Sequence, residues 1–284
     1  MAGAPKILAV VVLYRRSAEQ SESVMSLRSL IAGSVACWEA LELTICDNSP
    51  YPQAPPAGFD GLYVQDLANP GLAQRYNEAL RWAEKRGAAW LMLLDQDTTV
   101  TEGYLREVVE RAAAPETGSF VAMVPKLVEA GVVCSPAYPP TYGPARAIEL
   151  DFCGAARQNL QIFNSGAVVR VSALRTMGGF PERYPLDYLD HATFRTLQPQ
   201  GELLVLREAL EHQLSSNDSG RTDADFAERQ ERVLDAEYRF YAEYGSAKEQ
   251  VLRRTRLVRA ALGRVVRRKH VGQTWRMLKS ALRP

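Results

Sequence analysis

The 284-residue sequence lacks the features that mark several large classes of protein. No apolar run approaches the roughly 18 residues that suggest a membrane-spanning helix. The four cysteines form no C-x-x-C pair, and none has a histidine at zinc-site spacing. We therefore expect a reduced, cytosolic setting in which the thiols serve as small apolar residues. The apolar run at 7–13 is short and has no small-residue cleavage site after it, so a first strand is favoured over a signal peptide.

Several catalytic and binding motifs are also missing. There is no G-x-S-x-G and no ordered Ser-His-Asp series, so no activated nucleophile is evident. No glycine-rich loop with Lys or Arg follows the first predicted strand, which disfavours a sugar nucleotidyltransferase. No zinc finger or pair of RNA-binding aromatics is present, which argues against a nucleic-acid partner.

The charge is distributed unevenly along the chain. The formal net charge is only +1, but residues 253–283 hold eleven Lys or Arg and no acid, which leaves about −10 on residues 1–252. Such asymmetry suggests that the basic tail has a partner surface.

The first hundred residues alternate between two periodicities. Apolar, β-branched segments at 7–13, 41–47, 61–66 and 90–95 predict strands, and helical patterns lie at 19–32 and 72–86. This alternation predicts an α/β fold with a largely parallel sheet flanked by helices.

The pattern loosens after residue 100. The expected elements are a helix at 104–114, a strand at 119–125, a proline-rich irregular loop at 134–144, a strand at 160–171 interrupted near Gly166, a strand at 202–206 and a charged helix at 223–244. The composition suits one large domain, or one domain with an appendage.

Acidic residues end three of the predicted strands. Ligands bind beyond the carboxyl ends of strands in open parallel sheets, so Asp47, Asp66 and Asp95 are candidates for a site. For Asp66 the preference of aspartate for turns and caps is the simpler explanation.

The stretch Asp95-Gln96-Asp97 is less easily explained as a turn. Thr98 and Thr101 can cap the next helix without help from the aspartates. Two carboxylates at a rigid strand end offer hard oxygen ligands to a divalent cation, which completes its coordination with substrate phosphates.

An ordered series of short motifs extends these observations. The series is VVVLYRR, ICDNS, NPGLAQRYNEAL, LLDQDT, FNSGAVV, GGFPERYPLDYLDH and EHQLS. Over residues 7–215 the chain resembles a family 2 glycosyltransferase of the GT-A fold, and within that family the bacterial rhamnosyltransferases. The resemblance implies a GT-A domain at 1–215, with a nucleotide-sugar half at about 1–100 and an acceptor half at about 101–215. Residues 216–284 form a helical region with a basic amphipathic tail.

The resemblance also assigns roles in donor binding. It places the nucleotide sugar against Val12, Tyr14, Asp47, Asn69, Gly71, Asp95, Gln96 and Gly166. Within this set Asp47 accepts a hydrogen bond from the ring N–H of uracil or thymine, and Asp95 contacts the ribose or the sugar.

The resemblance assigns the chemistry to three more residues. Asp97 binds the Mg²⁺ or Mn²⁺ that bridges the diphosphate, His212 completes the metal shell, and Asp190 is the catalytic base. General chemistry agrees with this division. A bound cation neutralises charge on the leaving diphosphate, and a single carboxylate takes the proton of the acceptor hydroxyl. Direct attack then inverts the sugar configuration.

Each assignment has a simpler structural alternative. Asp47 can start an Asx turn, Asn69 can cap a helix whose first residue is Pro70, and Gly166 can mark a bulge. His212 can be an ordinary histidine, and Asp187 and Asp190 can be surface charges or caps on one helical face. Trp90 and Cys153 are expected to pack in the core. One departure is Ala192, because relatives usually carry an acid two residues after the base.

The basic tail has amphipathic character. Its predicted apolar face is Val251, Thr255, Val258, Leu262 and Val265, with Arg253, Arg256, Arg267 and Lys269 mainly elsewhere and Trp275 adding apolar weight. Such a helix is typical of binding to an anionic membrane surface through residues 253–284. The alternatives are packing on the acidic body or in a homodimer.

The sequence as a whole therefore predicts an inverting, metal-dependent glycosyltransferase. The resemblance implies transfer of L-rhamnose from dTDP-rhamnose to a saccharide acceptor, lipid-linked, in cell-surface polysaccharide synthesis. The expected location is cytoplasmic and peripheral at the inner face of the plasma membrane. The alternatives are a UDP-sugar-dependent family 2 enzyme and a non-catalytic, membrane-bound assembly factor with the same fold.

Overall fold

A computed structural model describes residues 6–33, 40–140, 145–156, 159–212, 223–266 and 271–283. Its strands are β1 (Ile7–Leu13), β2 (Leu41–Asp47), β3 (Leu62–Gln65), β4 (Trp90–Asp95), β5 (Phe120–Glu129), β6 (Val132–Ser135), β7 (Ala137–Tyr138), β8 (Arg146–Ala147), β9 (Gly154–Ala156), β10 (Val168–Arg170) and β11 (Glu202–Glu211). Its α-helices are α1 (Glu22–Ala32), α2 (Leu72–Lys85), α3 (Glu102–Ala113), α4 (Val171–Thr176), α5 (Leu189–Leu197), α6 (Asp223–Tyr244), α7 (Ala247–Val266) and α8 (Val271–Ala281).

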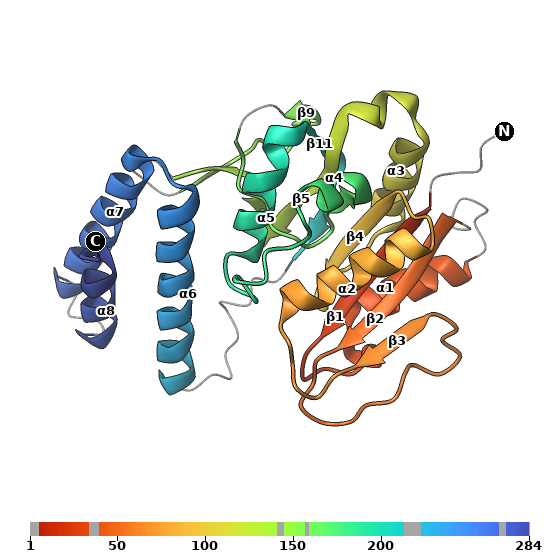
Figure 1. The fold of residues 1–284 in the computed structure, drawn as a ribbon, viewed down its shortest axis with the longest axis horizontal. Helices are drawn as coiled ribbons and strands as arrows, with labels where there is room; N and C mark the ends of the chain where they lie inside the picture. The colour runs from red at the N-terminus through yellow and green to blue at the C-terminus, as the bar shows by residue number, and fades with distance from the viewer. Residues whose placement is uncertain are drawn as a thin grey trace.

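A mixed, mostly parallel sheet forms the centre of the molecule (Figure 1). Its strand order is β3-β2-β1-β4-β10-β5-β11-β9, with β6 paired to β5. Strands β1 to β4 are parallel neighbours, and in this register Val12 faces both Cys46 and Asp95. The carboxyl ends of β1, β2 and β4 therefore lie at one edge, and the predicted α/β fold is confirmed.

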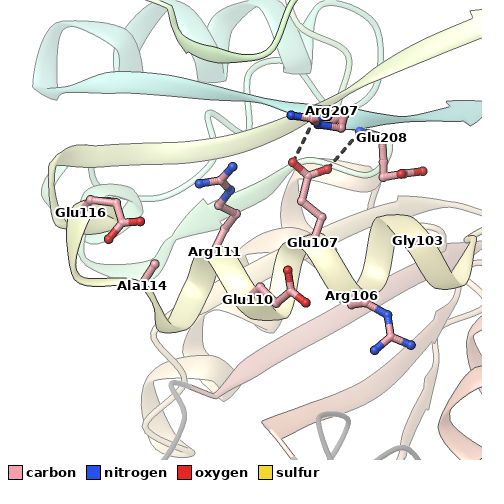
Figure 2. Close-up of a pocket in the computed structure, with 9 residues that line it drawn as sticks. All are labelled: Gly103, Arg106, Glu107, Glu110, Arg111, Ala114, Glu116, Arg207 and Glu208. Carbon is pink, nitrogen blue, oxygen red and sulfur yellow. Dashed lines mark hydrogen bonds between the residues drawn. The ribbon is translucent and has the colours of Figure 1, made fainter.

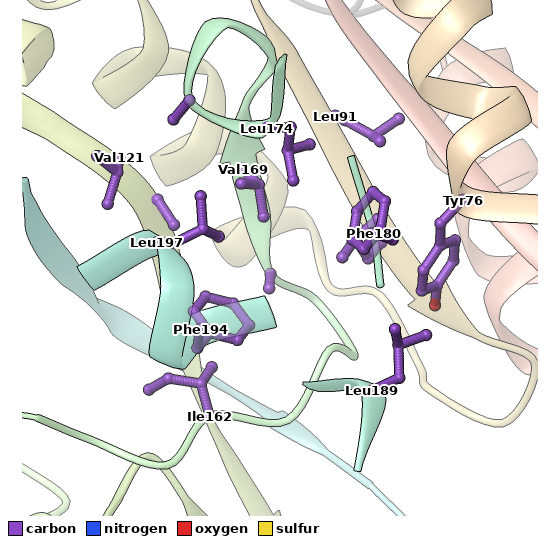
Figure 3. Close-up of a cluster of buried hydrophobic side chains, with 14 of the residues drawn as sticks. Tyr76, Leu91, Val121, Ile162, Val169, Leu174, Phe180, Leu189, Phe194 and Leu197 are labelled. Atoms are coloured by element: carbon purple, nitrogen blue, oxygen red, sulfur yellow. The ribbon is translucent and has the colours of Figure 1, made fainter. Parts of the chain in front are cut away.

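Alternate side chains of the central strands enter two separate cores. Leu8 and Val10 of β1 pack with α2, α4 and α5 in one core, part of which Figure 3 shows. Ile7, Ala9 and Val11 point to the other face and pack with α1 and α3. Burial on both faces explains why β1 and β4 are apolar at nearly every position.

The second half departs from the predicted elements. The strand expected over 160–171, with its interruption near Gly166, is confirmed only in part. After the interruption Val168–Arg170 forms β10, which pairs antiparallel with β4 and β5, and before it Gln161 makes only an isolated bridge to Ala137. Gly166, at φ +73°, precedes this strand in a turn, and its N–H donates to Leu93 O at 2.7 Å. The loop expected at 134–144 also contains part of β6 and all of β7. Strands β5 and β11 are longer than predicted because they pair in parallel, with an irregularity between Val205 and Ala209.

The two residues expected to pack in the core behave differently. Trp90 is buried, and the Arg170 guanidinium lies 4.2 Å from its ring centroid, so its packing role is confirmed. Cys153 is exposed, so that expectation is wrong. Cys46 is a buried thiol whose pKa is raised to about 12 by burial. Cys37 lies outside the described residues.

Helices α6, α7 and α8 gather at one end of the molecule, beside α5 (Figure 1). The buried side of α7 consists of Arg253, Leu257 and Ala261, whereas Val251 and Leu262 are exposed. Of the predicted apolar face, Val258 packs against Leu234, Leu257 and Ala281, whereas Thr255 is exposed like Val251 and Leu262, so the predicted face only partly coincides with the packed one. The side chain of Val265 and residues 267–270, with Arg267 and Lys269, lie outside the described part.

The charge of the tail is partly neutralised within the chain. Arg253 and Arg256 both pair with Glu237 of α6, and Arg283 pairs with Asp235 at 2.5 Å. Packing on protein, one of the alternatives for the tail, is thus realised for these cations.

The turn at Gly166 generates a stability prediction. A Cβ on Gly166 would lie 2.7 Å from Leu210 Cδ1 and 2.8 Å from Pro125 Cγ, in addition to the left-handed backbone conformation. We expect Gly166→Ala to lower the free energy of unfolding by about 2–4 kcal/mol, measured by denaturant titration without ligand, because steric overlap adds to backbone strain.

Gly178→Ala is the matched control. Gly178 also has a positive φ (+83°), but no atom lies within 4 Å of its Cβ position. We expect it to cost only about 1–2 kcal/mol. Equal losses in the two variants would contradict a packing role for Gly166, and unchanged stability with lost activity would favour its predicted approach to a sugar.

Candidate active site

The loop after β4 is held in place by two other elements. The N–H of Tyr14 at the end of β1 donates to Gln96 Oε1 at 2.9 Å. Ser21 and Ser23, at the start of α1, donate from their hydroxyls to the carbonyl oxygens of Gln96 and Asp95. Because two backbone carbonyls and the Gln96 side chain carry these bonds, the carboxylates of the acid pair stay available for other partners.

The structure brings Asp95, Asp97 and His212 together. One ligand atom from each lies within 4.8 Å of the others. His212 arrives at the end of β11, where its backbone pairs with Thr98, and its Nδ1 lies 3.1 Å from Thr98 Oγ1 and 4.0 Å from Asp97 Oδ1. His212 lies more than a hundred residues after the acid pair in the sequence, and the folded sheet brings them together in space.

The donor set fits a divalent cation. Asp97 Oδ1 is buried without a hydrogen-bond partner, which is rare for a carboxylate oxygen unless another ligand satisfies it. Two carboxylates and an imidazole match the ligand preferences of Mg²⁺ or Mn²⁺, with the imidazole better suited to Mn²⁺. These three residues could therefore hold the cation.

The electrostatics of the cluster point the same way. Burial, together with the charges of Asp97 and Asp190, raises the pKa of Asp95 to about 7. Burial also raises the pKa of Asp97 and lowers the pKa of His212. A bound cation would stabilise both carboxylates, and the imidazole is already favoured in the neutral form that ligates.

Asp190 lies near enough to the acid pair to affect its electrostatics. It lies in the first turn of α5, its carboxylate accepts a hydrogen bond from His191 N at 2.7 Å, and its charge contributes to the raised pKa of Asp95. Asp187 precedes the helix and lies 3.9 Å from Arg232. The two aspartates therefore do not form the pair of charges on one helical face that was the alternative. Ala192 is fully buried in the core.

Asp47 is buried and heavily hydrogen-bonded. Ser49 N donates to Oδ1 at 2.8 Å, which is the Asx turn of the alternative interpretation. Gln53, Tyr63 and Gln65 all donate to Oδ2. A pyrimidine N–H can reach this carboxylate only if one of these donors moves, so base recognition by Asp47 stays a prediction.

The predicted donor loop lies at the start of α2. Gly71, and not Asn69, is the N-cap of this helix, so the capping alternative for Asn69 is wrong. Asn69 is exposed in a left-handed conformation (φ 47°). The N–H of Leu72 donates to Pro185 O at 2.7 Å, which joins the donor loop to the segment before α5. Tyr14 is exposed at the same edge of the sheet, and Val12 is half-buried there.

Two residues near the site were not assigned to it from the sequence. Tyr76 of α2 is buried beside Phe180 (Figure 3), and its hydroxyl has no hydrogen-bond partner. The charges of Asp95 and Asp190 contribute to its raised pKa, so the hydroxyl lies near the site. Arg75 is also buried and pairs with Asp66 at 2.9 Å, which supports a structural role for Asp66. Helical periodicity does not distinguish such residues from core residues.

A charged groove between α3 and β11 is separate from this cluster. Figure 2 shows its lining, which contains none of the predicted site residues. Glu107 accepts hydrogen bonds there from the N–H groups of Arg207 and Glu208, where β11 departs from regular pairing. The Glu107 carboxylate therefore satisfies the backbone N–H groups of Arg207 and Glu208 in the irregular part of β11.

Solved structures provide an independent comparison. S. aureus TarS aligns with 97% of this chain and 55% of its own, at 14% identity and TM-score 0.54. The TarS 1–349 structure in complex with UDP-GlcNAc aligns over 97% and 91%, at 13% identity and TM-score 0.52. The mannosyltransferase PcManGT from Pyrobaculum calidifontis, in complex with GDP-Man and Mn²⁺, aligns over 99% and 74%, at 14% identity and TM-score 0.52.

The fold is of the GT-A type. At these identities the likeness shows a common fold, and the chain spans about half the length of full-length TarS. A scan of protein-family models and a search of curated proteins found no match. Membership of family 2 and of its rhamnosyltransferase group therefore stays a prediction.

The cluster predicts a specific response to metal. We expect MnCl₂ to raise the melting temperature of the parent protein, by an amount equivalent to about 2.7 kcal/mol at 100 times the Kd. The effect should grow as pH rises through about 7, because the proton on Asp95 then no longer competes with the cation. Asp97→Asn should abolish it, because the cation loses a charged ligand.

Asp66→Asn is the control for this experiment. Asp66 also follows a strand but pairs with Arg75, so its variant should keep the Mn²⁺ response even if it is less stable. A full response in Asp97→Asn would rule out the cation site.

Proposed function

We propose that the protein is an inverting, metal-dependent glycosyltransferase that uses a nucleotide-sugar donor. The observation that carries the proposal is the meeting of Asp95, Asp97 and His212 at one sheet edge, with Asp190 in the same electrostatic environment. The fold neighbours support it, because their structures contain UDP-GlcNAc in one case and GDP-Man with Mn²⁺ in the other.

The proposed chemistry divides between the acid pair and α5. Asp97 and His212, together with Asp95, would hold a Mg²⁺ or Mn²⁺ ion that neutralises the charge of the departing nucleoside diphosphate. Asp190 accepts the proton of the acceptor hydroxyl. The acceptor oxygen forms a bond to the anomeric carbon as the bond from that carbon to the phosphate oxygen breaks. A single displacement of this kind inverts the configuration.

The donor proposed from the sequence resemblance is dTDP-L-rhamnose. A UDP-sugar is the alternative, and the TarS complex with UDP-GlcNAc supports it. A thermal-shift panel of dTDP-rhamnose, UDP-GlcNAc and GDP-mannose, each with and without Mn²⁺, tests the function and selects between these donors. If no nucleotide sugar stabilises the protein in Mn²⁺, the non-catalytic assembly factor becomes the better explanation.

Asp190→Asn separates binding from transfer. The amide keeps the size of the side chain but cannot take a proton, so we expect transfer to fall by about 10²–10⁴-fold. The donor-induced thermal shift in Mn²⁺ should be unchanged. Product formation measured by chromatography checks the first point. Asp187→Asn is the matched variant, and a greater loss in it than in Asp190→Asn would identify Asp187 as the base.

We further propose a lipid-linked saccharide acceptor and a peripheral position at the inner face of the plasma membrane. The support is the exposed side of α8 and its C-terminal end. Trp275 of the helix is 69% exposed, Leu282 directly after the helix is 80% exposed, and Lys279 lies between them in the sequence. A basic helix with exposed Trp and Leu suits the interface of an anionic bilayer. In the described part of the chain, no helix is long and apolar enough to cross a membrane.

This membrane proposal predicts the behaviour of a double variant. We expect Trp275→Ser with Leu282→Ser to lose most of its binding to liposomes containing phosphatidylserine in a sedimentation assay, because both exposed apolar side chains are removed. Binding by the parent should weaken with salt, since each Lys or Arg near the surface contributes only about 1 kcal/mol.

The control replaces an exposed apolar residue outside the C-terminal helices. Val132 of β6 is 67% exposed, and Val132→Ser should bind liposomes as the parent does. Equal sedimentation of the double variant and the parent would place the membrane contact elsewhere or exclude it. Deleting residues 253–284 is a poorer test, because Arg253 is buried and paired with Glu237.

A further inference from the structure

The helix that carries Asp190 begins at a strained residue. Tyr188 is the N-cap of α5 and has φ +65°, in the left-handed region, and no side chain caps the helix there. A non-glycine residue keeps this conformation only when its surroundings hold it. Asp190 follows two residues later. The backbone conformation of Tyr188 therefore sets the direction in which α5 starts and, with it, the position of the proposed base.

Contacts from α6 and from His191 of α5 hold Tyr188 in this conformation. Its hydroxyl donates to Glu237 Oε1 at 3.0 Å. Its ring lies edge-on to His191, with centroids 4.8 Å apart, and 5.5 Å from the ring of Phe240. The hydroxyl bond is the directional contact among these, because it ties one atom of Tyr188 to one carboxylate oxygen.

Glu237 depends in turn on α7. Its side chain is only 5% exposed, and a buried carboxylate is stable only with compensating charge. Arg256 bonds to the oxygen that accepts from Tyr188, and Arg253 Nε lies 3.3 Å from the other oxygen. Arg253 also donates to Ser280 of α8, at 2.5 Å to the hydroxyl. A continuous series of polar contacts therefore runs from α8 through α7 and α6 to the start of α5.

We propose that Glu237, held by Arg253 and Arg256, positions the base by fixing Tyr188 through its hydroxyl. The C-terminal helices then belong to the acceptor half of the site, in addition to any role at a membrane. This rests on the proposed function, in which Asp190 takes the acceptor proton. Losing these helices should therefore impair transfer even to a soluble acceptor.

Two tyrosines of one loop allow a matched test. Tyr188 and Tyr184 each donate to a glutamate of α6 at 3.0 Å, but Tyr184 pairs with Glu243 and, unlike Tyr188, is not the N-cap of α5. We expect Tyr188→Phe to lower kcat by about tenfold or more, as expected for losing a hydrogen bond to a charged group. The donor KM and the donor-induced thermal shift in Mn²⁺ should stay as in the parent. Tyr184→Phe should leave kcat within about twofold of the parent.

A second pair of variants tests the charge that supports Tyr188. Glu237→Gln removes it, whereas Asp235→Asn removes another α6 acid, one that pairs with Arg283 of the C-terminal region. We expect only Glu237→Gln to lower kcat with donor KM unchanged. The Tyr188→Phe/Glu237→Gln double variant should lose little more than the worse single variant, because both break the same contact.

The outcomes separate this proposal from the proposed function. If the parent transfers sugar and Tyr188→Phe keeps its kcat within twofold, the positioning role is overturned and the proposed function stands. Fully additive losses in the double variant would also overturn it, because Glu237 would then act by another route. If the parent neither binds a nucleotide sugar nor transfers one, the proposed function fails, and the role of Asp190 as a base fails with it.

Discussion

Repulsion among partly buried carboxylates is the constraint around which this structure is organised. Asp95, Asp97 and Asp190 approach one another at the edge of the sheet, and burial of Asp95 already makes its charged form unfavourable. A protein usually avoids such a cluster, because repulsion between like charges lowers the stability of the folded state unless another charge compensates it. Here the backbone of the acid loop is held by Ser21 and Ser23, which leaves the carboxylates free for a cation. The arrangement is most easily understood if charge compensation comes with the metal and the substrate.

Other buried charges in the molecule are compensated from within. Arg75 is matched by Asp66, and Glu237 is matched by Arg253 and Arg256. Surface ion pairs contribute little to stability, but removing one partner of a buried pair typically costs several kcal/mol. The contrast is informative, because no Lys or Arg pairs with Asp95 or Asp97 among the described ion pairs, and the cluster lies where the fold places ligands. The compensated pairs support the site by positioning the elements around it.

The C-terminal helices change how the domains should be viewed. Composition alone separates a basic tail from an acidic body, and that difference suggested two independent parts. In the structure, α6 contacts α5 near the proposed base, and cations of α7 are neutralised by acids of α6. The exposed face of α8, with Trp275, is distinct from the buried face of α7. The same region can therefore meet a membrane on one side and support the site on the other.

The sequence by itself was sufficient for β1, β2, β4 and α2, whose bounds follow from unbroken apolar runs and a 3.6-residue period. It was also sufficient to single out Asp95 and Asp97, because two acids directly after a buried strand are unusual. Only the tertiary structure decided that β10 is short and antiparallel, that His212 reaches the acid pair, and that Glu237 supports Tyr188. These features depend on contacts between residues far apart in the chain. Local periodicity records the burial of a side chain and not the identity of the partner that it meets.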